Sequence, residues 1–183
     1  MISLADVALR PMTEDDLGMV RGWRNAPAIR RMMYTDHEIG ADEHARWFAA
    51  MAARDDGRLL IAEVSGRGPA GFVSVTGIDP RHGTCFWAFY ADAEKPLRGL
   101  GSAMEFHALD RMFRALGVRK VNCEVFAFNE RVIALHRRFG FRDEGLFREH
   151  KLKVGVPVDV VRLAMLSRDW PEHRERMRMA LGG

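Results

Sequence analysis

A glycine-rich loop between an apolar strand-like run and a long amphipathic helix constrains this chain more than any other feature. The loop reads Lys95-Pro96-Leu97-Arg98-Gly99-Leu100-Gly101-Ser102-Ala103. Gly99 and Gly101 have no side chains, so a ligand can approach the backbone closely. The free N–H groups at the start of the helix then face that ligand, together with the positive end of the helix dipole. The loop therefore predicts a site for a phosphate or diphosphate group.

Two common phosphate-binding loops do not fit this sequence. A dinucleotide-binding loop has three glycines directly after the first strand, followed by an acid about 20 residues later. Here the motif holds only two glycines, and three strand-like runs separate it from the first strand. A P-loop requires Gly-Lys-Ser/Thr, which is absent. The phosphate-bearing ligand must therefore be held in another way.

Length and charge limit the class of protein. The 183 residues predict one domain, 1–183, and 48% apolar residues are enough for a core. The net charge of +3 is too small to indicate nucleic acid, and no clustered basic and aromatic surface is present. An anionic small molecule fits the charge equally well. We therefore expect a small-molecule ligand and no nucleic-acid partner.

Cysteine usage and hydropathy bear on the compartment. Cys85 and Cys123 lie in strand-like runs outside any CxxC pair, so we expect two buried thiols, no metal and a reducing compartment. Acidic residues interrupt the N-terminal segment where a signal peptide would be apolar. No apolar run approaches the ~20 residues of a membrane span. We expect a soluble cytoplasmic protein without a membrane partner; the oligomeric state stays open, with a homodimer as one option.

The expected elements alternate between strands and helices. Their order predicts a mixed α/β sheet flanked by helices, and the unit 84–125 must be a right-handed crossover between parallel strands. The almost wholly apolar run 84–91 predicts a central strand covered on both faces. Expected strands are 7–11, 59–64, 71–78, 84–91, 120–126, 141–147 and 158–166, and expected helices are 13–23, 42–54, 98–115, 129–138 and 168–181.

A second motif, Asn129-Glu130-Arg131-Val132-Ile133-Ala134-Leu135-His136-Arg137-Arg138-Phe139-Gly140-Phe141, follows the glycine loop. It resembles the Asn-x-x-Ala-x-x-Leu-Tyr-x-x-x-Gly-Phe segment of the GNAT superfamily of N-acetyltransferases. The glycine loop resembles that superfamily's Arg/Gln-x-x-Gly-x-Gly/Ala, with Pro96 at the first position. The resemblance covers roughly residues 5–167. It implies a mostly antiparallel central sheet with one splayed parallel strand pair, and acetyl transfer from acetyl-CoA to an amine.

The resemblance also implies which residues hold acetyl-CoA. Backbone amides of the loop would bind the diphosphate, and the preceding strand would offer backbone groups to the pantetheine arm. Asn129 and His136 are seven residues apart on a helix, so they point the same way. The implied acetyl-CoA residues are Phe89, Tyr90, Ala91, Leu97, Arg98, Gly99, Leu100, Gly101, Ser102, Asn129 and His136.

Three residues are candidates for catalysis. His136 occupies the position of the family's tyrosine, which protonates the departing thiolate; it either does the same or only contacts the coenzyme arm while water is the acid. Glu124 lies mid-strand, where an acid is costly unless it is paired or active, and it is our candidate to accept the amine proton, directly or through water. The alternative is a structural carboxylate bonded to a neighbouring Arg or amide. Ser74 would orient the water or the amine.

The N-terminal third bears on the acceptor. Trp23-Arg24-Asn25-Ala26-Pro27-Ala28-Ile29-Arg30-Arg31-Met32-Met33-Tyr34 and Glu43-His44-Ala45-Arg46-Trp47 resemble the N-acetyltransferases of pseudaminic acid biosynthesis. That resemblance implies a UDP-linked amino-dideoxy sugar, acetylated at its 4-amino group on the way to flagellin glycans. Arg24 would bind the diphosphate, His44 would donate to a phosphate or carbonyl, and Met33, Tyr34 and Trp47 would pack on the uracil and the sugar.

Other interpretations stay open at this point. Arg24 could pair with Asp15, Asp16 or Glu43, and the side chains of the 42–54 helix at helical spacing could be core. A ribosomal-protein N-terminal acetyltransferase shares the Trp-Arg-Asn-like opening and would need a peptide groove. A non-catalytic acyl-CoA-binding sensor is a further alternative from a different class, although the presence of Glu124 and a candidate acid argues against it.

Overall fold

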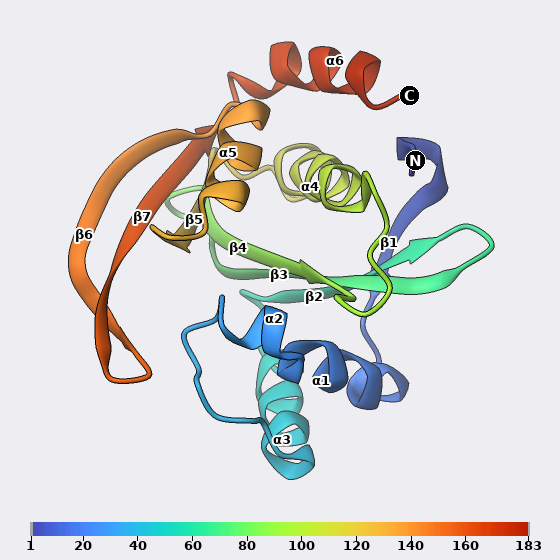
Figure 1. Cartoon of the computed structure of the whole chain (residues 1–183). Coiled ribbons are helices and arrows are strands. Elements are labelled where there is room, and N and C mark those ends of the chain that lie inside the picture. Colours follow the sequence, from blue (N-terminus) through green and yellow to red (C-terminus); the bar gives the residue numbers. More distant parts are fainter. Residues whose placement is uncertain (1, 183) are drawn as a thin grey trace.

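The computed structural model describes residues 2–182, so the predicted domain bounds, 1 and 183, lie outside the described residues. Within this range one seven-stranded sheet has the order β1-β2-β3-β4-β5-β7-β6. Neighbouring strands are antiparallel except β4 and β5, which are parallel (Figure 1). The predicted mixed sheet with one parallel pair is confirmed. The strands are β1 (Val7–Pro11), β2 (Arg58–Val64), β3 (Gly68–Asp79), β4 (Thr84–Ala91), β5 (Lys120–Phe126), β6 (Arg142–Lys153) and β7 (Val156–Leu166).

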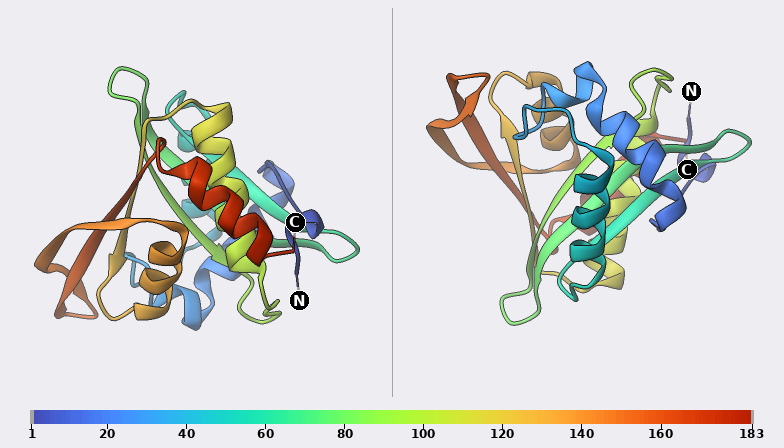
Figure 2. Two further views of the ribbon diagram at one scale, coloured as in Figure 1. Left: turned by 90° about the horizontal axis from the view of Figure 1, so that it is seen from above. Right: turned by 90° about the horizontal axis from the view of Figure 1, so that it is seen from below.

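Helices cover both faces of this sheet. In Figure 1, α4, α5 and α6 lie on one face and α1, α2 and α3 on the other, and Figure 2 shows the two faces separately. The main core lies between the sheet and α4, which buries most of its side chains. The helices are α1 (Leu17–Asn25), α2 (Pro27–Arg30), α3 (Ala41–Ala52), α4 (Leu100–Asp110, continued by a π-helical turn, Arg111–Ala115), α5 (Glu130–Phe139) and α6 (Trp170–Ala180).

The parallel pair is short, and its strands separate. Thr84 pairs with Lys120, Cys85 with Val121 and Phe86 with Asn122, and the pairing ends there. β4 continues to Ala91, while β5 pairs along its whole length with β7 on its other side. The second half of β4 therefore presents backbone groups toward β5 without a strand partner, which leaves them for a ligand.

The prediction that strand 84–91 is covered on both faces is wrong. Cys85 and Trp87 are buried beneath α4, but Phe86 is 36% exposed and Ala88 is also exposed. On that second face the helical layer reaches Tyr90 near the end of β4, which packs against the cluster around Trp23, but it leaves Phe86 and Ala88 uncovered. This face of β4 is therefore open around Phe86 and Ala88.

The last two strands are longer than predicted and form a hairpin that extends beyond the rest of the sheet (Figure 1). Pro157, expected in a loop, lies inside β7. It is tolerated because β5 pairs with β7 only from Val160 onward, so the missing N–H disrupts no ladder bond on that side. The Lys153 ammonium donates to the Met33 carbonyl over 2.6 Å, which ties this hairpin to the segment after α2.

Three predicted helix starts differ in detail. The helix expected from Arg98 begins at Leu100, and Gly99 precedes it in the left-handed region with φ 98°. Asn129 precedes α5 as predicted, but its side chain makes no capping bond, and its backbone carbonyl accepts the N–H of Val132 and of Ile133 instead. The helix after Thr13 opens with a short 3-10 turn before α1.

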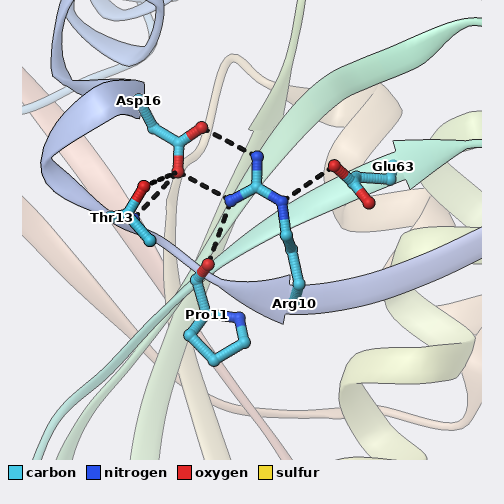
Figure 3. Close-up of polar contacts among 5 residues, drawn as sticks. All are labelled: Arg10, Pro11, Thr13, Asp16 and Glu63. Carbon is cyan, nitrogen blue, oxygen red and sulfur yellow. Dashed lines mark hydrogen bonds and ion pairs between the residues drawn. The ribbon is translucent and has the colours of Figure 1, made fainter.

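A polar cluster fixes the start of α1 against the sheet (Figure 3). The Arg10 guanidinium donates to both Asp16 oxygens, over 2.7 and 2.8 Å, and to Glu63 over 2.8 Å. Asp16 also accepts the Thr13 N–H over 2.8 Å. Arg10 is the main cause that holds the pKa of Asp16 below its ordinary range. The cluster thereby links α1 to both β1 and β2.

We expect Asp16→Asn to lower the free energy of unfolding by about 2 kcal/mol at pH 7, because it leaves the Arg10 guanidinium without its bidentate partner. Since folding depresses the Asp16 pKa, this contribution is present above its ordinary value of 3.8 and is lost as the pH falls through the lower folded value. Urea unfolding at pH 7 and below pH 3.8 measures both effects. Asp15→Asn, on the exposed side of the same turn, is the control; equal stability of Asp16→Asn and wild type at pH 7 would contradict the account.

Candidate active site

A cavity of about 890 Å³ opens where β4 and β5 separate. Its walls come from the second half of β4, the glycine loop, the start of α4, β5, α5 and the segment around α2. All eleven residues that the sequence predicted for acetyl-CoA line this one cavity. They are Phe89, Tyr90, Ala91, Leu97, Arg98, Gly99, Leu100, Gly101, Ser102, Asn129 and His136.

One end of the cavity is the N-terminus of α4. Gly99 adopts a φ of 98°, which a residue with a side chain reaches only with strain. Among residues 2–182 no hydrogen bond takes up the N–H of Gly101 or Ser102. Arg138 from α5 donates to the Ser102 hydroxyl over 2.8 Å, so a cation stands beside these amides. The arrangement suits a diphosphate.

The inner wall of the cavity contains a buried ion pair. His136 is 3% exposed, and its Nδ1 lies 2.8 Å from Oε1 of Glu105, whose side chain is 0% exposed. Burial raises the pKa of Glu105. Burial also opposes a charged imidazole, but the Glu105 carboxylate, with Cys123 beside the ring, outweighs it and raises the pKa of His136 to about 10. The imidazole therefore carries a proton at neutral pH, as a general acid requires.

Glu124 lies on the opposite face of β5, and both of its oxygens have partners. Tyr34 donates its hydroxyl to Oε2 over 2.8 Å, and Arg162 donates to Oε1 over 2.5 Å. The alternative of a carboxylate bonded to a neighbouring Arg therefore has its contact. A carboxylate offers about four lone-pair sites, so Glu124 can still accept a proton from an amine or a water. Burial and then the Glu124 carboxylate raise the pKa of Tyr34, which stays a neutral donor.

The structure separates the remaining predicted residues into two groups. Met33 and Glu124 line the cavity, and Tyr34 reaches it through Glu124. Ser74, Arg24, His44 and Trp47 are not part of the lining. The Ser74 hydroxyl lies 3.5 Å from the carbonyl of Ala88, its cross-strand neighbour in the lining.

Two of these outer residues have unpartnered polar atoms. Nη1 of Arg24 and Nδ1 of His44 are buried without a hydrogen-bond partner. The predicted alternative, a pair between Arg24 and Asp16, is wrong, because Arg10 occupies that carboxylate; no ion pair of the described residues joins Arg24 to Asp15 or Glu43. Burial, followed by the charges of nearby arginines, lowers the pKa of His44, so this ring is neutral near pH 7.

An aromatic stack connects α3 to the cavity. The ring of Trp47 stacks on His44 at 5.0 Å and meets Phe72 edge-on at 6.1 Å. Phe72 in turn contacts Tyr90, which lines the cavity, at 5.0 Å. Trp47 is 36% exposed, so it is not a core residue. Phe72 thus separates Trp47 from the cavity-lining Tyr90, and His44 lies behind Trp47.

Sequence reasoning missed three residues of this site: Glu105, Arg138 and Arg162. Glu105 had a visible signal, since it is an acid among the apolar positions of a buried helix. Arg138 lies two residues after His136, at a position the motif leaves unspecified. Arg162 is the cross-strand partner of Glu124, and only the register between β5 and β7 reveals it.

Comparison with known families now decides the class of protein. Residues 6–142, well over half of the chain, match the model of the acetyltransferase (GNAT) domain. The chain belongs to the GNAT acetyltransferase family. It is an acetyl-CoA-dependent N-acetyltransferase, with acetyl-CoA as co-substrate.

The individual proteins that this chain resembles are distant from it in sequence. The SPbeta prophage-derived uncharacterized N-acetyltransferase YokL of Bacillus subtilis is 28% identical over 139 residues, 75% of this chain and 77% of that protein. The uncharacterized protein MJ1062 of Methanocaldococcus jannaschii is 23% identical over 79% of this chain but only 30% of its own length. Spermidine N-acetyltransferase from Vibrio cholerae, solved with CoA and spermine, has a TM-score of 0.86 at 21% identity, covering 91% of this chain and 99% of that one.

Two further findings concern metals and membranes. Residues 2–182 contain no group of three or more His, Cys, Asp or Glu side chains placed to hold a metal ion. In the same range no helix combines the length and the hydropathy that a bilayer crossing requires. Both predicted thiols, Cys85 and Cys123, are buried and free.

We expect Gly99→Ala to raise the acetyl-CoA Kd at least about tenfold, because a side chain at φ 98° strains the backbone whose amides face the diphosphate. Gly66→Ala is the matched control, since Gly66 has φ 70° with open space around it and lies in the β2–β3 turn. Calorimetric titration with acetyl-CoA measures the effect. Equal affinities of the two variants would exclude the loop as the coenzyme site.

Proposed function

We propose that this GNAT enzyme acetylates the 4-amino group of a UDP-linked amino-dideoxy sugar, a step of pseudaminic acid biosynthesis that leads to flagellin glycans. Glu124 accepts the amine proton, directly or through a water, and His136 protonates the CoA thiolate. The observation that supports an anionic acceptor best is the buried guanidinium nitrogen of Arg24 without a partner. A buried cation of this kind is stabilised by an anion such as a diphosphate.

Charge on the acceptor side favours an anion over a polyamine. Among the described residues, neither Arg24 nor Lys151 has a carboxylate partner, and the Lys151 ammonium lies 4.8 Å above the Tyr34 ring. The acids of this region are engaged: Glu124 with Arg162 and Asp36 with Lys153. A polycation would meet net positive charge here, whereas a nucleoside diphosphate would neutralise it.

Aromatic surface near the cations suits the uracil and the deoxygenated sugar. The Tyr34 ring is 43% exposed and meets Phe126 edge-on at 5.2 Å. Met33 lines the cavity beside it. Flat apolar side chains of this kind bind a base or a 6-methyl sugar by stacking. Trp47 and His44 would extend that surface along α3, and Arg24 would bind the diphosphate between them.

The transfer itself uses the two faces of the separated strands. The acceptor amine approaches the open face of β4 and attacks the thioester carbonyl, while Glu124 takes its proton. Ser74 of β3, opposite Ala88 of β4, orients the water or the amine. On the other face the protonated His136 ring gives its proton to the sulfur as the C–S bond breaks. The proton acceptor, Glu124, is therefore a carboxylate, and the proton donor, His136, is an imidazolium.

An acceptor panel tests the substrate class. We expect release of free CoA with a UDP-linked 4-amino-4,6-dideoxy sugar, and at least about 100-fold lower kcat/KM with spermidine or with a ribosomal-protein N-terminal peptide. Thiol release is measured with a chromogenic disulfide, and mass spectrometry locates the acetyl group. Faster acetylation of the peptide or of spermidine would overturn the proposal.

The same panel includes two arginine variants. Arg24→Met removes the proposed diphosphate ligand and is expected to raise the KM for the UDP-sugar about tenfold. Arg21→Met is the control, because Arg21 lies one turn away on α1 and its guanidinium reaches only the Ile39 carbonyl at 3.5 Å.

For Glu124→Gln we expect normal acetyl-CoA binding and a kcat reduced about 100-fold, because the amide cannot accept the amine proton. Glu144→Gln is the control; Glu144 is also ion-paired on this sheet, with Lys120 at 2.6 Å, but it lies outside the cavity. Steady-state kinetics and acetyl-CoA titration separate the two effects. A Glu124→Gln enzyme with wild-type turnover across the pH range would leave Glu124 a structural carboxylate only.

A further inference from the structure

A buried carboxylate in α4 has no structural explanation in the packing around it. Glu105 is fully buried, its Oε1 faces Nδ1 of His136 at 2.8 Å, and its Oε2 has no hydrogen-bond partner. An unpaired buried carboxylate oxygen is costly, and a hydrophobic residue at this position would pack into the same core without that cost. The position therefore fits a role in the reaction better than a role in stability.

The rings around His136 exclude water from the pair. Trp87 and Phe89 of β4 lie 5.4 and 6.0 Å from the imidazole, and Phe141 lies 5.1 Å from it. Because Glu105 occupies Nδ1, Nε2 is the ring nitrogen left to serve the cavity that His136 lines. The contact with Glu105 thus fixes both the orientation of the ring and the nitrogen that donates.

Few other titratable or charged groups act on this pair. From β5 the Cys123 thiol lies beside the imidazole, and from α5 the Arg138 guanidinium acts on Glu105. The β4 side chains and Phe141 are neutral aromatics. Glu105 is therefore the one full negative charge in contact with His136 among the described residues.

We propose that Glu105 is a positioning residue of the acetyl transfer, whose buried carboxylate keeps the His136 imidazole protonated and directs its Nε2–H into the cavity. This role of Glu105 rests on one part of the proposed function, the assignment of His136 as the proton donor to the CoA thiolate. Nothing in the two sequence motifs specifies an acid at this position.

The proton inventory of the step is balanced. As the amine nitrogen bonds to the carbonyl carbon, the C–S bond breaks and its electron pair stays on the CoA sulfur. Nε2–H of His136 transfers its proton to that sulfur. The proton lost by the amine passes through Glu124 or water to solvent, and His136 regains one from solvent once CoA has left. The negative charge of Glu105 does not change during the cycle.

Histidine NMR tests the charge relationship without any acceptor. In wild-type protein the ¹⁵N signals of His136 should keep an imidazolium pattern to a midpoint near pH 10, since the Glu105 carboxylate, with Cys123 beside the ring, raises the pKa to about that value. In Glu105→Gln the carboxylate charge is lost while burial still opposes the imidazolium and Cys123 still favours it, so the midpoint should fall toward 6.5, a shift of about three units. Asp110→Asn, which breaks a different ion pair of the same helix with Arg174, should leave the midpoint unchanged.

Kinetics with whichever amine the acceptor panel identifies provides the second readout. For Glu105→Gln at pH 8 we expect kcat to fall about 100-fold with the KM for acetyl-CoA within twofold of wild type. We also expect the basic limb of the pH profile of kcat to move to lower pH.

A Glu105→Gln enzyme with an unmoved His136 midpoint or an unmoved basic limb would overturn the proposal. If that variant does not fold, wild type alone decides: a His136 midpoint of 8 or lower contradicts the proposal, and one above 8 supports it. Failure of the UDP-sugar assignment would leave the titration unaffected.

Discussion

The early end of pairing between β4 and β5 is the constraint on which the rest of the structure depends. Three residue pairs join the strands, and beyond Phe86 and Asn122 they separate, because β5 follows β7 instead. This separation gives the cavity its position and leaves the backbone of β4 available to the acetyl-CoA arm. In the proposed mechanism this separation lets Glu124 and His136 act on opposite sides of one thioester.

The two sides of that centre differ in their electrostatics. On the coenzyme side a helix N-terminus, Arg138 and a buried imidazolium favour a diphosphate and a departing thiolate. On the proposed acceptor side a carboxylate is held between Tyr34 and Arg162, and the Lys151 ammonium beside the Tyr34 ring has no carboxylate partner among residues 2–182. The segment that carries Tyr34 is held by Lys153 at the tip of the β6–β7 hairpin, so residues distant in sequence define the proposed acceptor site.

The sequence predicted the helices and strands whose ends are set by nearby residues. Gly140 takes the left-handed conformation that ends α5, and the run Lys120–Phe126 has the bounds of β5, so both elements were located closely. Side-chain contacts and exposures that depend on strand register or on helix packing over the sheet could not be predicted. The contact between Glu124 and Arg162 requires the β5–β7 register, and the exposure of Phe86 depends on how far the α1–α3 layer reaches. Glu105 was visible as an acid in an apolar helix, but its partner followed only from the packing of α4 against α5.

A crystal structure of the protein with bound CoA tests the central claim most directly. The account predicts the diphosphate against the amides of Gly99 to Ser102 beside Arg138, and the sulfur between the separated ends of β4 and β5, within reach of His136 Nε2. A coenzyme whose diphosphate lies on other groups, or whose sulfur is kept out of the gap by packed side chains, would contradict it.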